Sequence, residues 1–437
     1  MKTRLEELRE KIGSREARIG VIGLGYVGLP LALEFAKAGF RVAGIDLNAD
    51  KIRVLQEGRS YIEDVPSEEL AAVMKDGRFS ASTDSVQLSS IDVINICVPT
   101  PLTRTKDPDV SHLVAALESI QRRLRSGQLV ILGSTTYPGT THELFVPMLE
   151  DTGLKAGEDF ALAFAPERID PGSEWAVREV PKVVGGETPL CTELAAELYE
   201  TIFDTVVRVS SSQSAEMVKL LENTFRAINI GLANEVALMC DRLGLDVWEV
   251  IEAAATKPYG FMKFLPGPGL GGHCIPVDPS YLSWKMKSLN FQARFIELAT
   301  EINSQMPGHV VQRVADLLNE DRLAVNGARV LVLGVAYKRD VSDMRESPAL
   351  DVIRGLVARG AEVAYHDPHV PECEIDGHLH KNVELTDERL RSSDLVAILT
   401  DHRAVDYRRV VRESGRVFDT RNATAGVSDD REKIRKL

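Results

Sequence analysis

The sequence lacks several features on which whole classes of protein depend. No apolar run among its 437 residues reaches the length of a transmembrane helix, so no membrane partner is expected. The formal net charge is −13 and the basic residues form no block, which argues against a nucleic acid as a main partner. Residues 1–18 are charged and amphipathic, so they predict a short helix and not a signal peptide.

Cysteine is equally scarce. The five cysteines are odd in number and scattered, and no pair has the spacing of a zinc finger. We therefore expect reduced thiols in a cytoplasmic protein, and no metal site. No short-period repeat is present, and the length predicts about two or three domains.

A glycine pattern marks the first part of the chain. Residues 18–22 form an apolar strand, a helical pattern runs to residue 38, and three glycines lie between them. In such a turn the first glycine bends the chain, the second lets backbone approach a pyrophosphate, and the third lets helix pack on strand. Asp46 ends the next strand, where a carboxylate binds ribose and repels a 2′-phosphate. The pattern predicts NAD, bound by Gly23, Leu24, Gly25, Tyr26, Val27, Gly28, Asp46 and Lys51.

More strands with polar ends follow. Residues 91–98, 129–132 and 159–164 are apolar enough for a buried parallel sheet. Open parallel sheets bind ligands at the carboxyl ends of their strands, although ordinary turn chemistry also explains each single residue. Glu167 could equally be a solvated loop carboxylate. The residues at these ends are Val98, Pro99, Thr100, Ser134, Thr135, Glu167 and Arg168.

The middle of the chain is helical. Residues 214–243 form one long helical pattern, and shorter helices are predicted over 246–255 and 292–306. Lys219 and Asn223 are four residues apart and share one helix face. The apolar neighbours of Lys219 predict partial burial, which favours a functional site over a solvated face. The excess of apolar surface on the long helix predicts a homodimer.

A loop rich in glycine and proline lies between the second and third of these helices. Residues 266–279 hold four glycines and four prolines around Cys274, with Asp278 four residues further on. Glycine lets the backbone approach a ligand, and proline stiffens the loop. The pattern favours a nucleophilic thiol beside a ligand cradle, while an incidental thiol on a surface loop stays possible. His273 either tunes that thiol or faces solvent.

The last third returns to alternating strands and helices. Strands are predicted over 327–334, 362–366, 395–399 and 416–419, with a helix over 345–359. A complete glycine fingerprint is missing, so we expect a nucleotide there and not a dinucleotide. The predicted fold is α/β, with two doubly wound Rossmann-like domains, 1–208 and 311–437, joined by a central helical region with a long helix, 209–310.

With these motifs placed, the chain resembles the UDP-glucose/GDP-mannose dehydrogenases, a family of nucleotide-sugar 6-dehydrogenases. The likeness covers nearly the whole chain and is greatest for the UDP-N-acetylglucosamine 6-dehydrogenase branch. The motifs that carry it lie at residues 23–30, 134–141, 165–172, 219–223, 266–279 and 334–348. The family implies an NAD domain, a central dimerisation region and a UDP-binding domain.

The resemblance also implies a reaction and its residues. The family oxidises the sugar C6 alcohol to a carboxylate with two NAD, through a thioester on a cysteine. That residue is here Cys274, and the assisting residues are Lys219, Asn223, Asp278, Glu167 and Thr135. Further cofactor contacts are implied at Val98, Pro99, Thr100, Ser134, Thr135 and Arg345. Substrate contacts are implied at Glu167, Arg168, Lys219, Asn223, Lys257, Leu265, Gly269, Gly271, Gly272, Tyr337, Lys338 and Arg421.

One departure bears on the substrate. Glucose-type members carry an arginine some sixteen residues before the cysteine, where this chain reads Lys257-Pro258-Tyr259. This favours a UDP-N-acetylhexosamine, UDP-GlcNAc first, over UDP-glucose, with UDP-GalNAc and UDP-ManNAc as alternatives. Two other classes stay open: a hydroxyacid dehydrogenase that transfers one hydride and needs no thiol, and a non-enzymatic NAD-sensing module.

Overall fold

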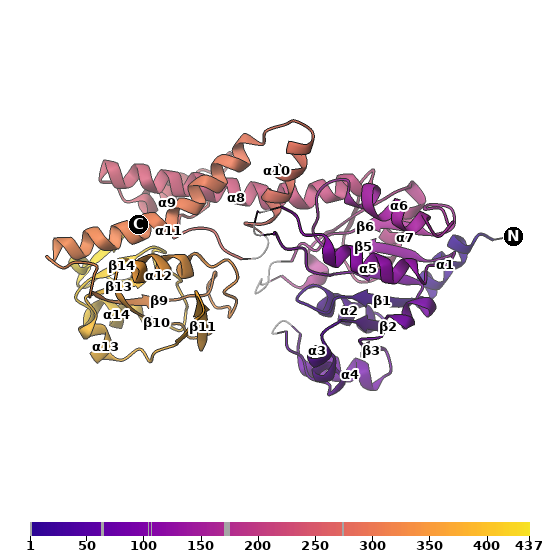
Figure 1. Ribbon diagram of the computed structural model, residues 1–437, viewed down its shortest axis with the longest axis horizontal. Coiled ribbons are helices and arrows are strands. Elements are labelled where there is room, and N and C mark those ends of the chain that lie inside the picture. The colour runs from indigo at the N-terminus through magenta and orange to yellow at the C-terminus, as the bar shows by residue number, and fades with distance from the viewer. Residues whose placement is uncertain (1, 63–64, 104, 106, 170–174, 273–274) are drawn as a thin grey trace. The chain divides into compact units, whose positions relative to one another are not determined.

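The computed structural model describes residues 2–62, 65–103, 105, 107–169, 175–272 and 275–437 (Figure 1). The chain divides into two compact units, which are described separately below. Unit 1 comprises Met1–Glu222 and Ser280–Asn290, and unit 2 comprises Asn223–Pro279 and Phe291–Leu437. Within the described part of the chain, no helix combines the length and the apolar character that crossing a bilayer requires.

Unit 1 is built on a sheet of eight strands in the order β3-β2-β1-β4-β5-β6-β7-β8, in which only the pairing of β6 with β7 is antiparallel among the described strands. The chain order reverses beside β1, which has β2 on one side and β4 on the other. A ligand site is expected at this reversal, beyond the carboxyl ends of the strands. The strands are β1 (Arg18–Ile22), β2 (Arg41–Ile45), β3 (Phe79–Ser82), β4 (Val93–Ile96), β5 (Leu129–Leu132), β6 (Ala161–Phe164), β7 (Lys182–Gly186) and β8 (Val206–Arg208).

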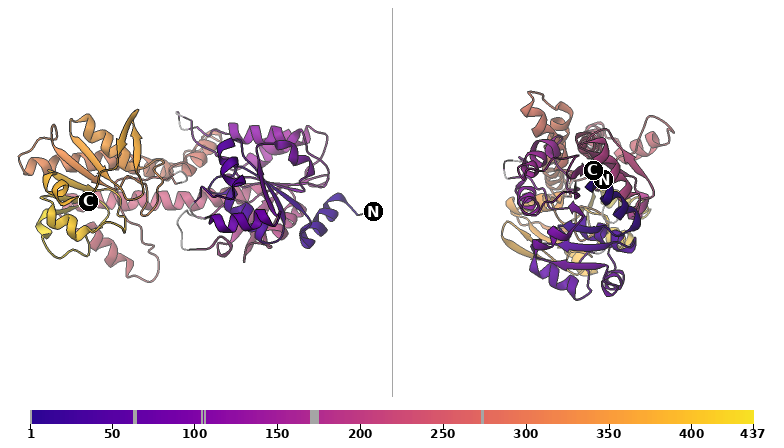
Figure 2. Two further views of the ribbon diagram at one scale, coloured as in Figure 1. Left: turned by 90° about the horizontal axis from the view of Figure 1, so that it is seen from below. Right: turned by 90° about the vertical axis from the view of Figure 1, so that its right-hand side faces the viewer.

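Helices cover both faces of this sheet (Figure 2). One hydrophobic cluster includes side chains of α1, α2 and α7, and a second includes those of α5 and α6. Strands β4, β5 and β6 are buried throughout because both of their faces are covered. The helices are α1 (Arg4–Ser14), α2 (Gly28–Lys37), α3 (Ala49–Gln56), α4 (Ser67–Lys75), α5 (Ser111–Gln121), α6 (Val146–Glu150) and α7 (Pro189–Tyr199), with short turns η1 (Ser85–Ser90), η2 (Thr141–Phe145) and η3 (Val177–Glu179).

Unit 2 combines helices with a smaller parallel sheet. Helix α8 (Ser212–Leu243) starts in unit 1, and α10 (Asp278–Ser288) lies mainly in unit 1, whereas α9 (Val247–Ala255) and α11 (Arg294–Glu320) belong to unit 2. The sheet has the order β10-β9-β13-β14-β15. Its strands are β9 (Arg329–Leu333), β10 (Glu362–His366), β13 (Leu395–Ile398), β14 (Val417–Asp419) and β15 (Ile434–Lys436). The remaining elements are a hairpin of β11 (Glu372–Ile375) and β12 (His378–Lys381), the helices α12 (Pro348–Ala358), α13 (Asp387–Ser392) and α14 (Tyr407–Glu413), and the turn η4 (Arg431–Lys433).

The predicted fold class is confirmed: each unit contains a mostly parallel sheet, and along the sequence a helical stretch that contains the long α8 lies between the strands of the two sheets. In the central helical region, two helices differ from the sequence prediction. Helix α10 was not predicted, and α11 continues past Met306 through Pro307 to Glu320. The three-part division at residues 208 and 310 stays a prediction.

Candidate functional site

The glycine turn after β1 has the geometry that the sequence predicted. Gly23 has φ +90°, and a Cβ there would lie 2.4 Å from the carbonyl oxygen of Cys97. A Cβ at Gly28 would lie 1.8 Å from the carbonyl oxygen of Gly23, so both positions exclude any side chain. At Gly25, by contrast, a Cβ would meet no described atom within 4 Å. The middle of the turn therefore has room for a ligand against bare backbone.

Asp46 connects the end of β2 to this turn. Its Oδ2 accepts the Leu24 N–H at 2.9 Å, and its Oδ1 accepts the Asn48 N–H at 2.9 Å. Lys51 lies 3.9 Å from the same carboxylate and over the ring of Tyr61. The Tyr61 hydroxyl donates to the Leu24 carbonyl. The carboxylate is thus held at the place where the sequence pattern expects an adenosine ribose.

The ends of β4 and β5 are joined by a side chain. Ser134 is buried, and its hydroxyl donates to the carbonyl oxygen of Val98 at 2.8 Å. Its side chain therefore braces the backbone around the predicted cofactor residues. Pro99 is exposed, and Thr100 and Thr135 are half-buried, so these three positions retain accessible surface.

Glu167, at the end of β6, is held in place by a buried lysine. Glu167 Oε1 accepts the N–H groups of Arg168 and Ile169 at 2.8 and 2.9 Å, and Oε2 lies 3.2 Å from Lys182 Nζ. Lys182 is buried beneath the rings of Tyr199 and Phe203. Burial opposes the charged form, but Lys182 and the two N–H groups outweigh it and lower the pKa of Glu167. The solvated-loop interpretation is therefore wrong, and sequence reasoning missed Lys182.

The first half of α8 faces the same strand ends. Lys219 is 8% exposed, as its apolar neighbours predicted. Arg168 forms a two-point ion pair with Glu222 on this helix. Besides Lys219 and Glu222, this part of α8 carries Glu216, which is fully buried and which sequence reasoning missed.

Glu216 anchors the loop that follows β5. Its carboxylate accepts the N–H of Gly139 at 2.5 Å, and the N–H and hydroxyl of Thr141 at 2.8 and 2.6 Å. Burial raises the pKa of Glu216 to about 7, although these hydrogen bonds favour the charged form. No sequence motif marks such a residue, since it contacts a distant loop through backbone groups.

Asn223 and Asp278 meet in unit 2. Both are buried, and the Asn223 amide donates to the Asp278 carboxylate. The pair joins α8 to the first residue of α10. The structure thus brings together two residues that are 55 positions apart and that the sequence assigned to one site.

The glycine-rich loop packs closely on the last third of the chain. Gly269 has φ +141°, and a Cβ there would lie 2.8 Å from Cβ of Pro348. A Cβ at Gly271 would lie 2.8 Å from Cβ of Tyr337, and the Gly272 N–H donates to the Arg345 carbonyl at 3.0 Å. Side chains at these positions would force the loop away from the Tyr337 segment. The predicted substrate residues Gly269, Gly271, Gly272, Tyr337 and Lys338 therefore lie in one region of unit 2.

Two buried asparagines hold the loop in place. The Asn234 amide donates to Asn303 Oδ1 at 2.8 Å, and its own Oδ1 accepts the Gly267 N–H at 2.9 Å. Asn303 donates in turn to the Ala227 carbonyl at 3.1 Å. This chain of amides links α8, α11 and the loop, and sequence reasoning missed Asn303.

The remaining predicted contacts are distributed unevenly. Arg421 lies with its guanidinium 2.6 Å from the Cβ position of Gly267, and burial lowers its pKa to about 10. Arg345 is paired with Asp343. Lys257 and Leu265 are exposed, and Lys257 lies over the Tyr259 ring. Cys274 and His273 lie outside the described residues, so their predicted roles stay predictions.

Comparison with known proteins identifies three consecutive matches. Residues 17–203 match the NAD binding domain of the UDP-glucose/GDP-mannose dehydrogenase family, residues 213–305 match its central domain, and residues 331–426 match its UDP binding domain. Together they span most of the chain in a single order.

Similar proteins agree in class and differ in sugar. A UDP-N-acetyl-D-glucosamine 6-dehydrogenase from Pseudomonas aeruginosa is 40% identical over 360 residues, 82% of this chain and 84% of the relative. A UDP-N-acetyl-D-mannosamine dehydrogenase from Methanococcus maripaludis is 35% identical over 404 residues, 90% of this chain and 88% of the relative. The solved structure of a UDP-D-ManNAc dehydrogenase from Pyrococcus horikoshii superposes with a TM-score of 0.86 at 33% identity, covering 96% of this chain and 99% of that one.

Proposed function

The chain belongs to the UDP-glucose/GDP-mannose dehydrogenase family of NAD-dependent UDP-sugar dehydrogenases, and we propose that it oxidises a UDP-N-acetylhexosamine, UDP-GlcNAc first, to the uronic acid. The observation that carries this is the match of the three family domains in order along one chain. The lysine at position 257 and the hexosamine substrates in the names of the relatives support an N-acetylated sugar.

The proposed reaction removes four electrons from one carbon. The C6 alcohol, two NAD⁺ and one water give the carboxylate, two NADH and three protons. The first hydride transfer leaves an aldehyde, to which the Cys274 thiolate adds as a thiohemiacetal. Loss of a second hydride gives a thioester, and water then releases the acid and the thiolate. NAD is the hydride acceptor, and residues of the chain stabilise the oxyanion, transfer protons and orient the substrate.

The contact between Asn223 and Asp278 supports separate roles for the assisting groups. A buried ammonium at Lys219 and the Asn223 amide can stabilise the oxyanion that forms when a thiolate or water adds to the carbonyl. Asp278 holds that amide in a fixed orientation.

The contacts of Glu167 bear on which carboxylate activates the hydrolytic water. Its two oxygens already accept three hydrogen bonds, and its lowered pKa makes it a weak proton acceptor. We therefore assign the general base to Asp278, and to Glu167 the orientation of the substrate. Thr135 remains the proposed hydroxyl contact between cofactor and substrate.

We further propose a cytoplasmic homodimer. The described cysteines Cys97, Cys191, Cys240 and Cys373 are free and buried, which fits a reducing compartment. Apolar side chains at positions 225, 232, 239 and 243 of α8 are exposed and recur at a spacing that places them on one helix face. A second copy of the chain is the proposed occupant of that face.

The test counts NADH. With limiting UDP-GlcNAc the enzyme should form two NADH per sugar, whereas a hydroxyacid-type mechanism gives one and a sensing module none. A panel of UDP-GlcNAc, UDP-GalNAc, UDP-ManNAc and UDP-glucose ranks the substrates by kcat/KM. A higher kcat/KM for UDP-glucose than for every N-acetylated sugar would contradict the proposed substrate class.

Substitution of Cys274 tests the thioester. Cys274→Ser should lower net turnover by roughly 10³-fold or more, about 4 kcal/mol of transition-state stabilisation, because an alkoxide leaves far less readily than a thiolate. NAD affinity, measured by fluorescence titration, should be unchanged. A variant that still forms the uronic acid at nearly the normal rate would remove the thioester mechanism.

A further inference from the structure

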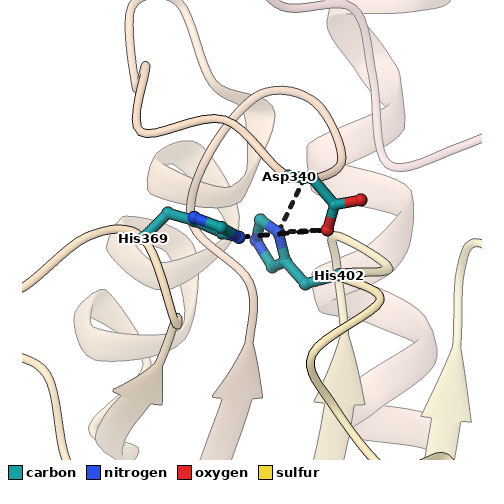
Figure 3. Close-up of side chains that lie close together, drawn as sticks. All are labelled: Asp340, His369 and His402. Atoms are coloured by element: carbon teal, nitrogen blue, oxygen red, sulfur yellow. Dashed lines mark hydrogen bonds and ion pairs between the residues drawn. The ribbon is translucent and has the colours of Figure 1, made fainter. Parts of the chain in front are cut away.

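Three side chains that the proposed oxidation does not use converge in unit 2 (Figure 3). Asp340 follows β9, His369 follows β10 and His402 follows β13, so the carboxyl ends of neighbouring parallel strands bring them together. One atom from each lies within 4.8 Å of the others. Asp340 Oδ1 is 3.8 Å from His402 Nδ1 and 3.9 Å from His369 Nε2. Their wide separation in sequence explains why spacing alone predicted no metal site.

The environment of His402 determines which of its nitrogens faces the cluster. The ring is fully buried, and Nε2 donates to Asp367 Oδ2 at 3.0 Å. Asp367 also accepts the N–H groups of Val335 and Ala336. A carboxylate thus fixes the proton on Nε2, which leaves the lone pair of Nδ1 directed toward Asp340.

We propose that Asp340, His369 and His402 bind a divalent transition-metal ion of the Zn²⁺ or Co²⁺ type. The ligands would be Asp340 Oδ1, His369 Nε2 and His402 Nδ1, with a fourth position left for water. Two imidazoles and one carboxylate form a set that suits Zn²⁺, whereas Mg²⁺ and Ca²⁺ prefer oxygen ligands. The contact between Asp367 and His402 supplies the carboxylate that orients a metal-binding histidine.

Binding has identifiable costs. Ligand atoms around tetrahedral zinc lie about 3.3 Å apart, because each bond is about 2.0–2.1 Å, so each of the two distances from Asp340 to a histidine must shorten by roughly half an ångström. The Asp340 N–H now donates to His402 Nδ1 at 3.0 Å, and the ion must replace that hydrogen bond. Arg403 donates its backbone N–H to Asp340 Oδ1, the proposed ligand atom, at 2.9 Å and its Nε–H to Oδ2, and both contacts reduce the negative charge available to an ion. We therefore expect weaker binding than at a four-ligand structural zinc site.

The position of Asp340 gives the site a consequence. Asp340 has φ +57° and lies in the segment between Tyr337 and Arg345. An ion bound to all three residues would tie this segment to the ends of β10 and β13. It would restrict the loop that carries the proposed substrate residues, without taking part in hydride transfer.

The test uses Co²⁺, whose visible absorption reports coordination. Untagged protein should show a saturable tetrahedral spectrum, and Zn²⁺ should displace the Co²⁺ and raise the melting temperature. His369→Ala and Asp340→Asn should each weaken binding by tenfold or more, since the loss of even an outer-sphere partner costs about 10–100-fold. Asparagine also tolerates the left-handed backbone at position 340. The matched control is His378→Ala, which removes an exposed imidazole of β12 and should change nothing.

The outcomes are distinct. A spectrum with thiolate-to-cobalt charge transfer that persists in the His369→Ala/Asp340→Asn double variant would place the ion on a cysteine and overturn the proposal. Failure to see any saturable absorption would overturn it as well. Neither result depends on which sugar the enzyme oxidises.

Discussion

Asp46 illustrates how one side chain can serve both structure and selectivity. Its carboxylate holds the Leu24 and Asn48 N–H groups, so it fixes the turn as well as offering an acceptor for ribose. Asp46→Asn should lower kcat/KM for NAD about 10–100-fold, the value of a hydrogen bond to a charged group. The ratio of NADP to NAD efficiency should rise, because the repulsion of a 2′-phosphate is removed. A native enzyme that used both cofactors equally would contradict this assignment.

Glu216 should make stability depend on pH. Its pKa is about 7 in the folded chain, above the ordinary value of 4.5, so the native state keeps a proton that the unfolded state releases. The associated stabilisation is complete below about pH 4.5 and is lost as pH rises through about 7. The loss is on the order of 3 kcal/mol.

Urea titrations of Glu216→Gln provide the measurement for this prediction. Between about pH 5 and about pH 8, the free energy of unfolding should fall more in the native protein than in this variant. Glu118→Gln, which changes an exposed carboxylate of α5, is the control and should follow the native protein. Parallel curves for the native protein and Glu216→Gln would mean that the carboxylate is already charged at low pH.

At the scale of elements, the sequence predicted the strands that apolar runs and terminal glycines mark, but it made no prediction for β3, β7, β8, β11, β12 and β15. Strands β1, β5 and β10 match their predicted ranges residue for residue. The predicted range of helix α11 ended at Met306, before Pro307, because proline normally ends a helix. Pro307 is tolerated because it is buried in a helix that packs on α12, a tertiary effect that no local pattern reports.

The residues of the candidate site were predicted only where a local sequence pattern marks them. Glycine turns, strand ends and the lysine–asparagine pair follow from local spacing. Lys182, Glu216 and Asn303 did not, because each acts through a contact with a residue remote in sequence. The cluster of Asp340, His369 and His402 was not predicted for the same reason.

Pro307 also forms part of the surface of α11 on which the glycine-rich loop packs at Gly269. Proline has no N–H to donate to the Asn303 carbonyl, and both that oxygen and the proline ring lie 3.4 Å from the Cβ position of Gly269. Gly269→Ala should therefore destabilise the protein by about 1–3 kcal/mol and raise KM for the UDP-sugar more than KM for NAD. Gly308→Ala, where a Cβ would meet no described atom within 4 Å, is the control. Equal effects of the two substitutions would show that the close packing at Gly269 does not matter for stability or for UDP-sugar binding.

At the scale of the whole molecule, the exposed face of α8 predicts assembly. Leu232 and Met239 are 56% and 50% exposed. Leu232→Asp/Met239→Asp should convert a dimer to a monomer in sedimentation velocity, because burying two carboxylates without partners is unfavourable. Leu379→Asp, on the β12 hairpin, should leave the sedimentation coefficient unchanged. A native protein that sediments as a monomer at micromolar concentration would contradict the prediction.

The division of the chain into units has a consequence for its biosynthesis. Unit 1 takes its last helical segment from residues 280–290, where the Tyr281 hydroxyl donates to the Thr100 carbonyl, Lys285 pairs with Glu143 and Trp284 packs on Tyr137. A ribosome releases these residues only after it has made residues 223–279, which belong to unit 2. The nascent eight-stranded sheet must therefore wait, with the loops at positions 100 and 137 uncovered, until part of its neighbour has been translated.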